Sequence, residues 1–372
     1  MRIGKFEFNL RELAGSMGDF GTLLPLAIGY ITVCGLNPTG LLVMMGLANI
    51  ATGLVYRLPM PIEPMKVLAV MAIAGAWAPE KVYAAGVAMG AVWLLMGATG
   101  AMGWVARWTP KTVVRGIQLS LGVLLGLKGL EMMSGWWVLG VVCVLIVLLL
   151  RKNRYAPAAL VLVGLGIVIM GLRGELASIR GVGFSLPPLI GVDPRLIWPA
   201  FRDGGLSQIP LTATNAVIAT SVLISEYWPD RRVTERQLSF NMGVMNLLVP
   251  FFGGMPMCHG AGGLAGQYYF GARTGGTNII EGSIEIGLGL LLGGSIATLF
   301  AAFPVAIVGA MMLMVGVELL KFARELRFDR RLLPVAATVA GSVILNMAVG
   351  FAAGLILHYL VLGRPEDTDG AE

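Results

Sequence analysis

Two short stretches of this sequence decide the fold: Pro59–Lys66, which reads PMPIEPMK, and Gly253–Gly266, which reads GGMPMCHGAGGLAG. A proline removes a backbone N–H and clashes with the preceding helical turn, so the first stretch is extended and becomes helical only near Glu63. In the second stretch, Pro256 and the glycines delay the helix until about His259. Both stretches therefore predict a short helix that begins inside an apolar region.

The composition places these stretches in a membrane. Mean hydropathy is +0.80, and 56% of the 372 residues are hydrophobic, whereas only 13% are charged. A soluble domain carries about a quarter charged residues. Apolar stretches of about 17–25 residues, the length that spans hydrocarbon, recur along the whole chain. Non-helical backbone at membrane depth is tolerated only where protein buries it or where it lines a wet cavity.

The apolar stretches predict an all-α polytopic membrane protein with fourteen transmembrane segments. The third and tenth segments, which contain the two broken stretches, are too short to cross as plain helices. The expected segments are 12–34, 40–57, 63–77, 81–105, 115–131, 136–150, 156–172, 205–226, 237–252, 259–271, 282–301, 303–320, 332–346 and 347–362.

The basic residues predict the orientation of these segments. If the N-terminus lies in the cytoplasm, most of the 27 lysine and arginine residues fall on the cytoplasmic side, and several exceptions share the loop 173–204. This bias is typical of membrane proteins. We therefore expect a multi-pass protein of the cell (inner) membrane with both termini cytoplasmic. The charge is explained by topology, so no nucleic-acid partner is expected.

The two halves of the chain repeat three elements in the same order. A proline is followed by a Met-Gly-x-x-Asn element and then by a Met-Pro element. The copies are Pro25, Met45–Asn49 and Met60–Ile62 in the first half, and Pro210, Met242–Asn246 and Met255–Met257 in the second. Seven segments per half is an odd number, so the second half is inverted relative to the first, as in many transporters.

The repeat divides the chain into four parts. We expect a first seven-segment repeat at 1–172, an extracytoplasmic connecting loop at 173–204, an inverted second repeat at 205–362 and a cytoplasmic tail at 363–372. The inversion points the two half-helix N-termini at each other. Facing N-termini offer unpaired N–H groups and positive dipole ends, which together suit an anion. Gly260, Gly262 and Gly263 would let a ligand approach the backbone closely.

At these residues the sequence resembles the molybdate transporter family, which is related to sulfate permeases. PMPIEPMK resembles one signature of that family, and Met255–Gly275 resembles a second, long and specific one. Glu12–Pro25 and Gln208–Asn215 are similar to it as well. The resemblance implies a core domain of segments one to four and eight to eleven, a gate domain of the other segments, and molybdate, tungstate or sulfate as substrate. The sequence departs from the family pattern at Glu63, where glutamine is usual.

The candidate substrate-binding residues follow from the half-helices and the resemblance: Glu63, Met65, Lys66, Gln208, Thr212, Asn215, His259, Gly260, Ala261, Gly262 and Thr22. Glu63 is either a proton carrier or the ion-pair partner of Lys66, three residues on. Asp19 either bonds the broken backbone or takes part in coupling. Glu281 and Glu285 stand one turn apart and are candidates for a proton relay.

Three classes of function were compared. A secondary transporter of a small inorganic oxyanion, either coupled to protons or facilitative, fits best. The alternative is a transporter of the same fold for a nucleobase or an aromatic carboxylate, which would require a carboxylate in segment eight or ten near the site. An enzyme is not expected, since no nucleophile–base pair is evident. No cofactor or metal is expected, because Cys34, Cys143 and Cys258 have no paired spacing. The oligomeric state stays open, with a homodimer as one candidate.

Overall fold

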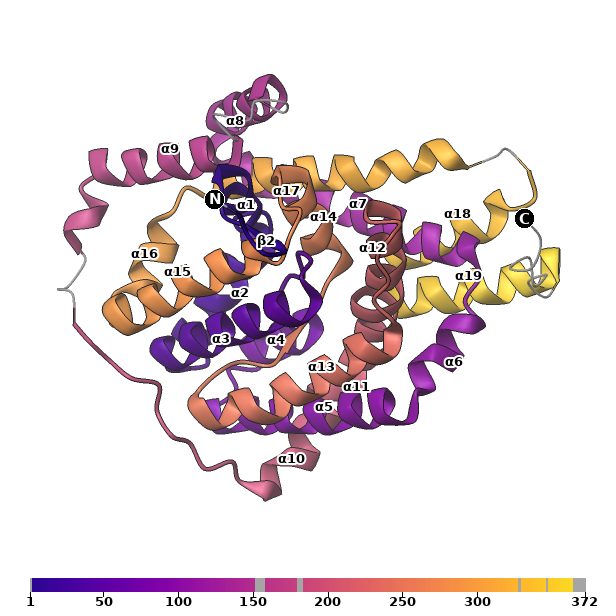
Figure 1. Cartoon of the computed structure of the whole chain (residues 1–372), viewed down its shortest axis with the longest axis horizontal. Coiled ribbons are helices and arrows are strands. Elements are labelled where there is room, and N and C mark those ends of the chain that lie inside the picture. The colour runs from indigo at the N-terminus through magenta and orange to yellow at the C-terminus, as the bar shows by residue number, and fades with distance from the viewer. Residues whose placement is uncertain (1, 151–157, 179–182, 327–328, 346, 364–372) are drawn as a thin grey trace.

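The computed structural model describes residues 2–150, 158–178, 183–326, 329–345 and 347–363. These residues form a bundle of helices (Figure 1) in which the first half of the chain contributes nine: α1 Leu10–Gly15, α2 Phe20–Thr32, α3 Pro38–Tyr56, α4 Lys66–Ala74, α5 Pro79–Thr99, α6 Ala101–Arg107, α7 Lys111–Met133, α8 Trp137–Leu150 and α9 Ala158–Leu172. The expected cytoplasmic tail begins at Gly363, and its other residues lie outside the described part.

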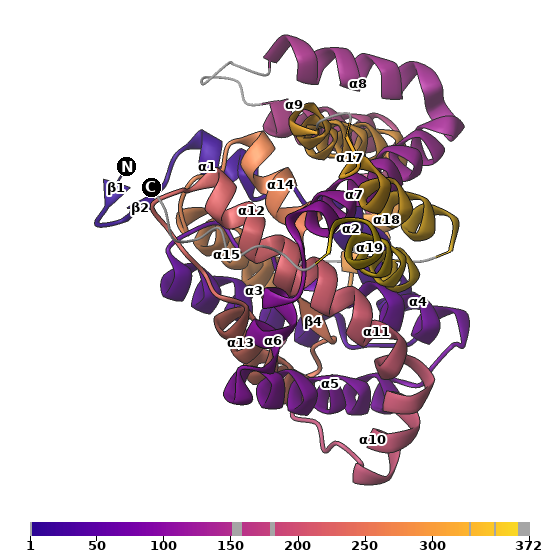
Figure 2. The ribbon, with the colours of Figure 1, turned by 90° about the vertical axis from the view of Figure 1, so that its right-hand side faces the viewer.

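The second half contributes the remaining helices: α10 Pro194–Ala200, α11 Leu206–Leu211, α12 Thr220–Tyr227, α13 Glu235–Leu248, α14 Ala261–Phe270, α15 Gly276–Leu292, α16 Ile296–Ala302, α17 Val305–Leu320, α18 Leu332–Ile344 and α19 Met347–Leu362. Two π-helical segments, η3 Phe201–Gly205 and η4 Thr212–Ala219, flank α11. Viewed from the side, α8 and α9 lie at one edge of the molecule and α10 at the opposite edge (Figure 2).

Five helical stretches in the described part are long and apolar enough to cross a membrane: Pro38–Tyr56, Pro79–Thr99, Lys111–Leu150, Gln208–Tyr227 and Val305–Arg324. Several shorter helices are also apolar, among them Ala158–Leu172 and Leu332–Ile344. The protein is therefore a multi-pass membrane protein.

The two broken stretches cross each other as short strands. β3 (Glu63–Pro64) pairs antiparallel with β4 (Met257–Cys258), with Glu63 opposite Cys258. This pairing delays both helices beyond the expected positions. We expected helices from about Glu63 and His259, but α4 begins at Lys66 and α14 at Ala261. The expectation was wrong by two or three residues because the backbone at the crossing bonds to the other stretch instead of to its own helix.

Three other expected segments also differ from the structure. Segment 81–105 is divided at Gly100 into α5 and α6. Segment 12–34 is interrupted between α1 and α2, where the backbone at Gly18 passes against α14. A Cβ atom on Gly18 would lie 2.5 Å from Gln267 N and from the carbonyl carbon of Gly266. Segment 282–301 was placed too late, since α15 covers Gly276–Leu292 and the short α16 follows separately.

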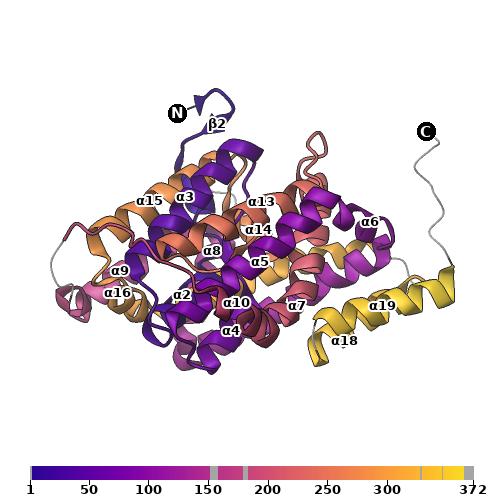
Figure 3. The ribbon, with the colours of Figure 1, turned by 90° about the horizontal axis from the view of Figure 1, so that it is seen from below.

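The helices pack in two groups. α3 packs against α15, and α13 packs against α5, so each pair joins a helix of the first half to a helix of the second. In the other group, α7 packs against α17 and α18, and α18 and α19 lie side by side (Figure 3). The small β1–β2 hairpin (Arg2–Ile3 and Phe6–Glu7) projects at the N-terminus.

Contacts near the helix ends show which ends lie on the same side of the bundle. On one side, Lys81 Nζ lies 2.7 Å from Asp203 Oδ2, and Ile190 N donates to Phe251 O. On the other side, the Glu12 carboxylate accepts from the backbone N–H groups of Arg273 and Thr274. The charge bias predicts that the second side is cytoplasmic.

Candidate functional site

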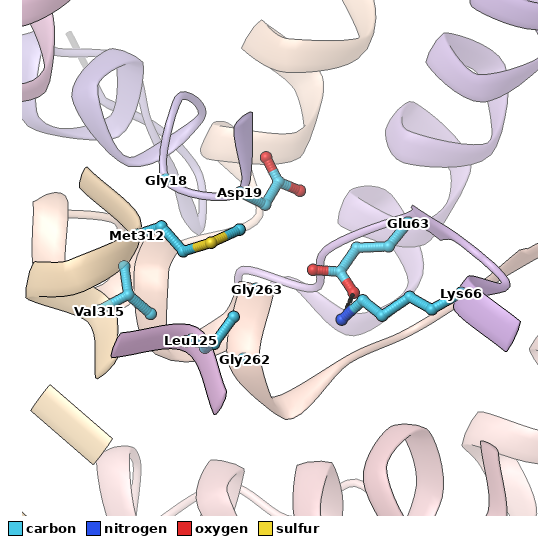
Figure 4. Close-up of a pocket in the computed structure, with 9 residues that line it drawn as sticks. All are labelled: Gly18, Asp19, Glu63, Lys66, Leu125, Gly262, Gly263, Met312 and Val315. Atoms are coloured by element: carbon cyan, nitrogen blue, oxygen red, sulfur yellow. Dashed lines mark ion pairs between the residues drawn. The ribbon is translucent and has the colours of Figure 1, made fainter. Parts of the chain in front are cut away.

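A small cavity lies where the two broken stretches meet (Figure 4). Its lining comes from the α1–α2 connection, the residues around the start of α4, the first turn of α14, and helices α7 and α17. The lining residues are Gly18, Asp19, Glu63, Lys66, Leu125, Gly262, Gly263, Met312 and Val315. Segments distant in sequence therefore meet around one space, and both half-helices, α4 and α14, contribute to it.

Lys66 and Glu63 form an ion pair at this cavity. Lys66 Nζ lies 2.9 Å from Glu63 Oε2; the Glu63 side chain is fully buried, and that of Lys66 is 24% exposed. Lys66 is the first residue of α4, where a cation is unfavourable next to the positive end of the helix dipole. The Glu63 carboxylate offsets this. The predicted pairing is present, but it does not follow a helical face, because Glu63 belongs to β3 and α4 begins only at Lys66.

The Glu63 carboxylate also lies against the first turn of α14. A Cβ atom on either Gly260 or Gly263 would collide with that carboxylate. Gly262 instead faces α7: a Cβ atom added to Gly262 would lie 3.2 Å from Leu125 Cδ1. Glycines are therefore required here by close approach, since any side chain would fill the space between the half-helices.

Three residues that were expected to bind substrate form hydrogen bonds within the protein instead: Gln208, Thr212 and Asn215. Gln208 Oε1 accepts from the backbone N–H groups at the start of α4, and Gln208 Nε2 donates to Thr212 Oγ1. Asn215 Oδ1 accepts from the N–H of Ala261, the first residue of α14. These side chains lie next to the half-helices, but the cavity described above is lined by others.

His259 and Met65 lie next to the paired strands β3 and β4. His259 Nδ1 donates to Pro61 O at 3.2 Å, and its ring meets Tyr56 edge-on at 6.1 Å. The buried Nε2 atom has no hydrogen-bond partner among the described residues. Met65 is fully buried, and its N–H donates to Pro256 O. The side chain of Thr22 lies outside the described part of the chain.

Buried amides hold the extended backbone of both broken stretches. Asn246 exchanges hydrogen bonds with the backbone of Met257, and Asn278 does the same with Met60. Asn278 Nδ2 also donates to Asn49 Oδ1. Asn49 and Asn246 belong to the repeated Met-Gly-x-x-Asn element, so that repeat marks residues that support the site. Asn278 was missed, because nothing nearby in the sequence identifies its partner.

Glu281 and Glu285 belong to the same buried layer. Glu281 Oε2 accepts from Gln267 Nε2 at 3.0 Å, and Glu285 Oε2 accepts from Asn49 Nδ2 at 2.9 Å. Each thus has an amide partner from a neighbouring helix. Among the described residues, no group of three or more His, Cys, Asp or Glu side chains is arranged to hold a metal ion.

Sequence reasoning also missed Gly18, Leu125, Met312 and Val315 as lining residues. Gly18 lies in the stretch Glu12–Pro25 that carried part of the resemblance, so a signal existed there. The three apolar residues lie on α7 and α17, where most neighbours are apolar as well. An apolar side chain that faces a cavity cannot be told from one that faces lipid by residue type alone.

Comparisons with known proteins show which proteins this chain is similar to. The profile of a family described as "Molybdate transporter of MFS superfamily" matches residues 11–125 and 200–319. The chain is 31% identical over 409 residues to Molybdate transporter 1 of Arabidopsis thaliana, covering 96% of this chain and 90% of the relative. It is 32% identical over 422 residues to Molybdate transporter 2 of the same plant, covering 96% and 88%.

Solved structures share the fold at low sequence identity. The transmembrane domain of a cyanobacterium bicarbonate transporter, BicA, superimposes with a TM-score of 0.57 at 16% identity, over 93% of this chain and 97% of that one. The murine Solute Carrier 26 family member A9 anion transporter, in its inward-facing state, gives a TM-score of 0.61 at 14% identity, over 97% and 69%. The described helices therefore adopt the membrane fold of these proteins.

Proposed function

Because this chain belongs to the molybdate transporter family, we propose that it is a secondary transporter of molybdate or a similar tetrahedral oxyanion such as tungstate or sulfate. The observation that carries the proposal is the cavity at which Lys66 and the first turn of α14 meet. Lys66 supplies a positive charge. The first-turn N–H groups of α14, at Gly262 and Gly263, are donors that a helix cannot pair internally.

The balance of charge at the cavity supports proton coupling. Lys66 is already paired with Glu63, and Asp19 also lines the cavity. A dianion that binds Lys66 comes within a few ångströms of these carboxylates, and like charges at that distance disfavour one another. We infer that Glu63 takes up a proton when the anion binds and that Asp19 assists. Binding of substrate and binding of a proton are then linked.

The two packing groups support alternating access between a core and a gate. The crossed strands and both half-helices lie in the first group, and α7 and α17 of the second group cover the cavity with Leu125, Met312 and Val315. At the end of the bundle predicted to be cytoplasmic, Arg115 of α7 pairs with Glu226 of α12. Next to this pair, Tyr227 of α12 stacks on Tyr268 of α14. A seven-plus-seven inverted repeat, with both termini cytoplasmic in the inner membrane, would relate the two half-helices.

Uptake of labelled molybdate into proteoliposomes tests this function. We expect unlabelled tungstate and sulfate to compete, and uracil and benzoate to have no effect. Competition by uracil or benzoate alone would favour the alternative substrate class. Lys66→Met should raise the KM for molybdate about 10- to 100-fold, the size expected when a charged hydrogen bond is lost.

A matched control exists for the lysine variant. Lys128 and Glu131 also form an ion pair three residues apart on a helix, with Nζ–Oε1 at 2.8 Å, but both side chains are exposed. Lys128→Met should leave KM unchanged, since an exposed pair of this kind contributes little. An equal loss in both lysine variants would indicate a general effect of charge and would contradict a local anion site at Lys66.

A further inference from the structure

One continuous helical segment, formed by α11, η4 and α12, runs past the N-termini of both half-helices. Gln208 Oε1 accepts from the N–H groups of Val67 at 2.8 Å and Leu68 at 3.1 Å. Two turns later, Asn215 Oδ1 accepts from the N–H of Ala261 at 3.2 Å. Both amide side chains are buried. The same segment therefore bonds the first turn of α4 and the first turn of α14.

Neither half-helix is capped by its own sequence. Met65 and Gly260 occupy the N-cap positions, and neither provides a side-chain hydrogen bond to its helix. The first N–H groups of a helix lack an acceptor within the helix, and buried donors without an acceptor are unfavourable. Val67 and Leu68 are the second and third residues of α4. The Gln208 amide therefore acts as a cap supplied by another helix.

Local structure fixes the orientation of the Gln208 amide and shapes the backbone at Asn215. Gln208 Nε2 donates to Thr212 Oγ1 at 2.8 Å, which turns Oε1 toward α4. Thr220 Oγ1 donates at 2.8 Å to the carbonyl of Asn215, five residues earlier, within the π-helical part of the segment. π-helical turns are rare and occur frequently at functional sites. Here the wider turns begin after Gln208 and include Asn215, so they set the angle between the two caps.

We propose that Gln208 and Asn215 are positioning residues of the oxyanion site, which fix the two half-helix N-termini relative to each other without binding the anion. This inference rests on the proposed oxyanion transport. An amide is suited to the task because it accepts hydrogen bonds without placing a negative charge beside an anion. Since Gln208 already bonds the first turn of α4, the anion takes its ligands asymmetrically, from Lys66 and the first turn of α14.

Two substitutions at position 208 separate capping from charge. Gln208→Met removes the acceptor at similar length. It should lower the melting temperature of the ligand-free protein in detergent and raise the KM for molybdate about tenfold or more, because a small displacement of binding groups has large effects. Gln208→Glu keeps the acceptor and adds a charge. It should keep the wild-type melting temperature and still raise KM about tenfold.

Asn215 should behave in the same way toward α14. Asn215→Leu is expected to lower the melting temperature and raise KM, whereas Asn215→Asp is expected to raise KM alone. Thr214→Val is the control on the same segment, because among the described residues the buried Thr214 hydroxyl bonds only within its own segment, to Pro210 O and Leu211 O. Its KM should stay within about twofold of wild type.

Three results would overturn the inference. A wild-type KM in Gln208→Met would show that the cap does not position the site. A raised KM with an unchanged ligand-free melting temperature in Gln208→Met would identify Gln208 as a direct ligand of the anion. An equal rise of KM in Thr214→Val would indicate a non-specific effect. If the wild-type protein took up no oxyanion, the proposed function would fail instead, and the melting temperatures would still decide the capping role.

Discussion

At the scale of single residues, Glu63 has two roles that the structure brings together. Its carboxylate pairs with Lys66 and lies against the glycines of the first turn of α14. It therefore occupies the position to which a substrate anion would be drawn. A carboxylate in this position competes with the anion when ionised and ceases to compete when it is protonated. The pair with Lys66 and the proposed proton uptake would thus belong to the ionised and the protonated form of the same Glu63 carboxyl group.

Glu63→Gln tests this account, since glutamine mimics the protonated acid. If proton uptake accompanies anion binding in the wild-type protein, as proposed above, transport should rise as external pH falls. In Glu63→Gln we expect molybdate binding to be retained, the pH dependence to become flat, and accumulation against a gradient to weaken. The measurement is the initial rate of molybdate uptake into proteoliposomes as a function of external pH.

The exposed Glu131 provides the control for this substitution. Its pair with Lys128 has the same spacing as the pair at the cavity, but it lies away from the site. Glu131→Gln should keep the wild-type pH profile. If Glu63→Gln kept that profile too, Glu63 would not carry the proton, and its pairing with Lys66 would be purely structural.

At the scale of elements, α7 and α17 touch through their backbones along a row of glycines. A Cβ atom on Gly129 would lie 2.6 Å from Gly309 O, and one on Gly316 would lie 2.7 Å from Gly122 O. Small residues at helix interfaces in membranes allow this close approach. Because both helices supply lining residues to the cavity, their separation sets the position of its apolar wall.

Two glycines on α7 make a matched pair for testing this contact. Gly129→Ala should destabilise the protein by about 1–3 kcal/mol, because the backbone of α17 cannot yield to the added methyl group. At Gly126 the added Cβ would meet only Leu313 Cδ1, at 3.9 Å. Gly126→Ala should therefore be neutral or stabilising by about 0.5–1 kcal/mol, the usual gain of alanine over glycine in a helix.

The melting temperature of the substrate-free protein in detergent distinguishes the two alanine variants. Equal stability of Gly129→Ala and Gly126→Ala would mean that α7 and α17 can separate without cost. The close packing would then play no part in fixing the wall of the cavity.

At the scale of the whole molecule, the two sides of the helix bundle make opposite predictions about labelling. Leu189, 84% exposed in the 183–193 stretch, lies on the side predicted to be external. Arg232 is exposed in the loop between α12 and α13, on the side predicted to be cytoplasmic. We expect Leu189→Cys to react with an impermeant thiol reagent added to intact cells, and Arg232→Cys to react only after permeabilisation.

The native cysteines do not interfere with this experiment. Cys34, Cys143 and Cys258 are free and buried. The unmodified protein should therefore remain unlabelled in intact cells, and it serves as the background. The reverse labelling pattern of the two variants would invert the orientation that the basic residues predict.

The sequence by itself determined the features that depend on local chemistry. The prolines and glycines of the two broken stretches required extended backbone wherever the rest of the chain placed them, and the structure confirms that a short helix follows each one. The pairing of Glu63 with Lys66 was predicted from three residues of spacing on a helix; the pair is present, although Glu63 lies in β3 before α4 begins. Hydropathy identified the class of protein, since the length of an apolar stretch and the thickness of a bilayer are directly comparable.

Only the tertiary structure decided what the polar and apolar side chains of distant helices do. Gln208 was predicted as a substrate ligand. Its side-chain oxygen instead accepts from the backbone N–H of Val67 in α4, which is 141 residues away in the sequence. Leu125 and Met312 line the cavity although their surroundings in sequence are uniformly apolar. In a membrane, residue type does not separate a helix face that meets lipid from one that meets protein, because both are apolar. Which face of each helix points to the site is therefore set by packing.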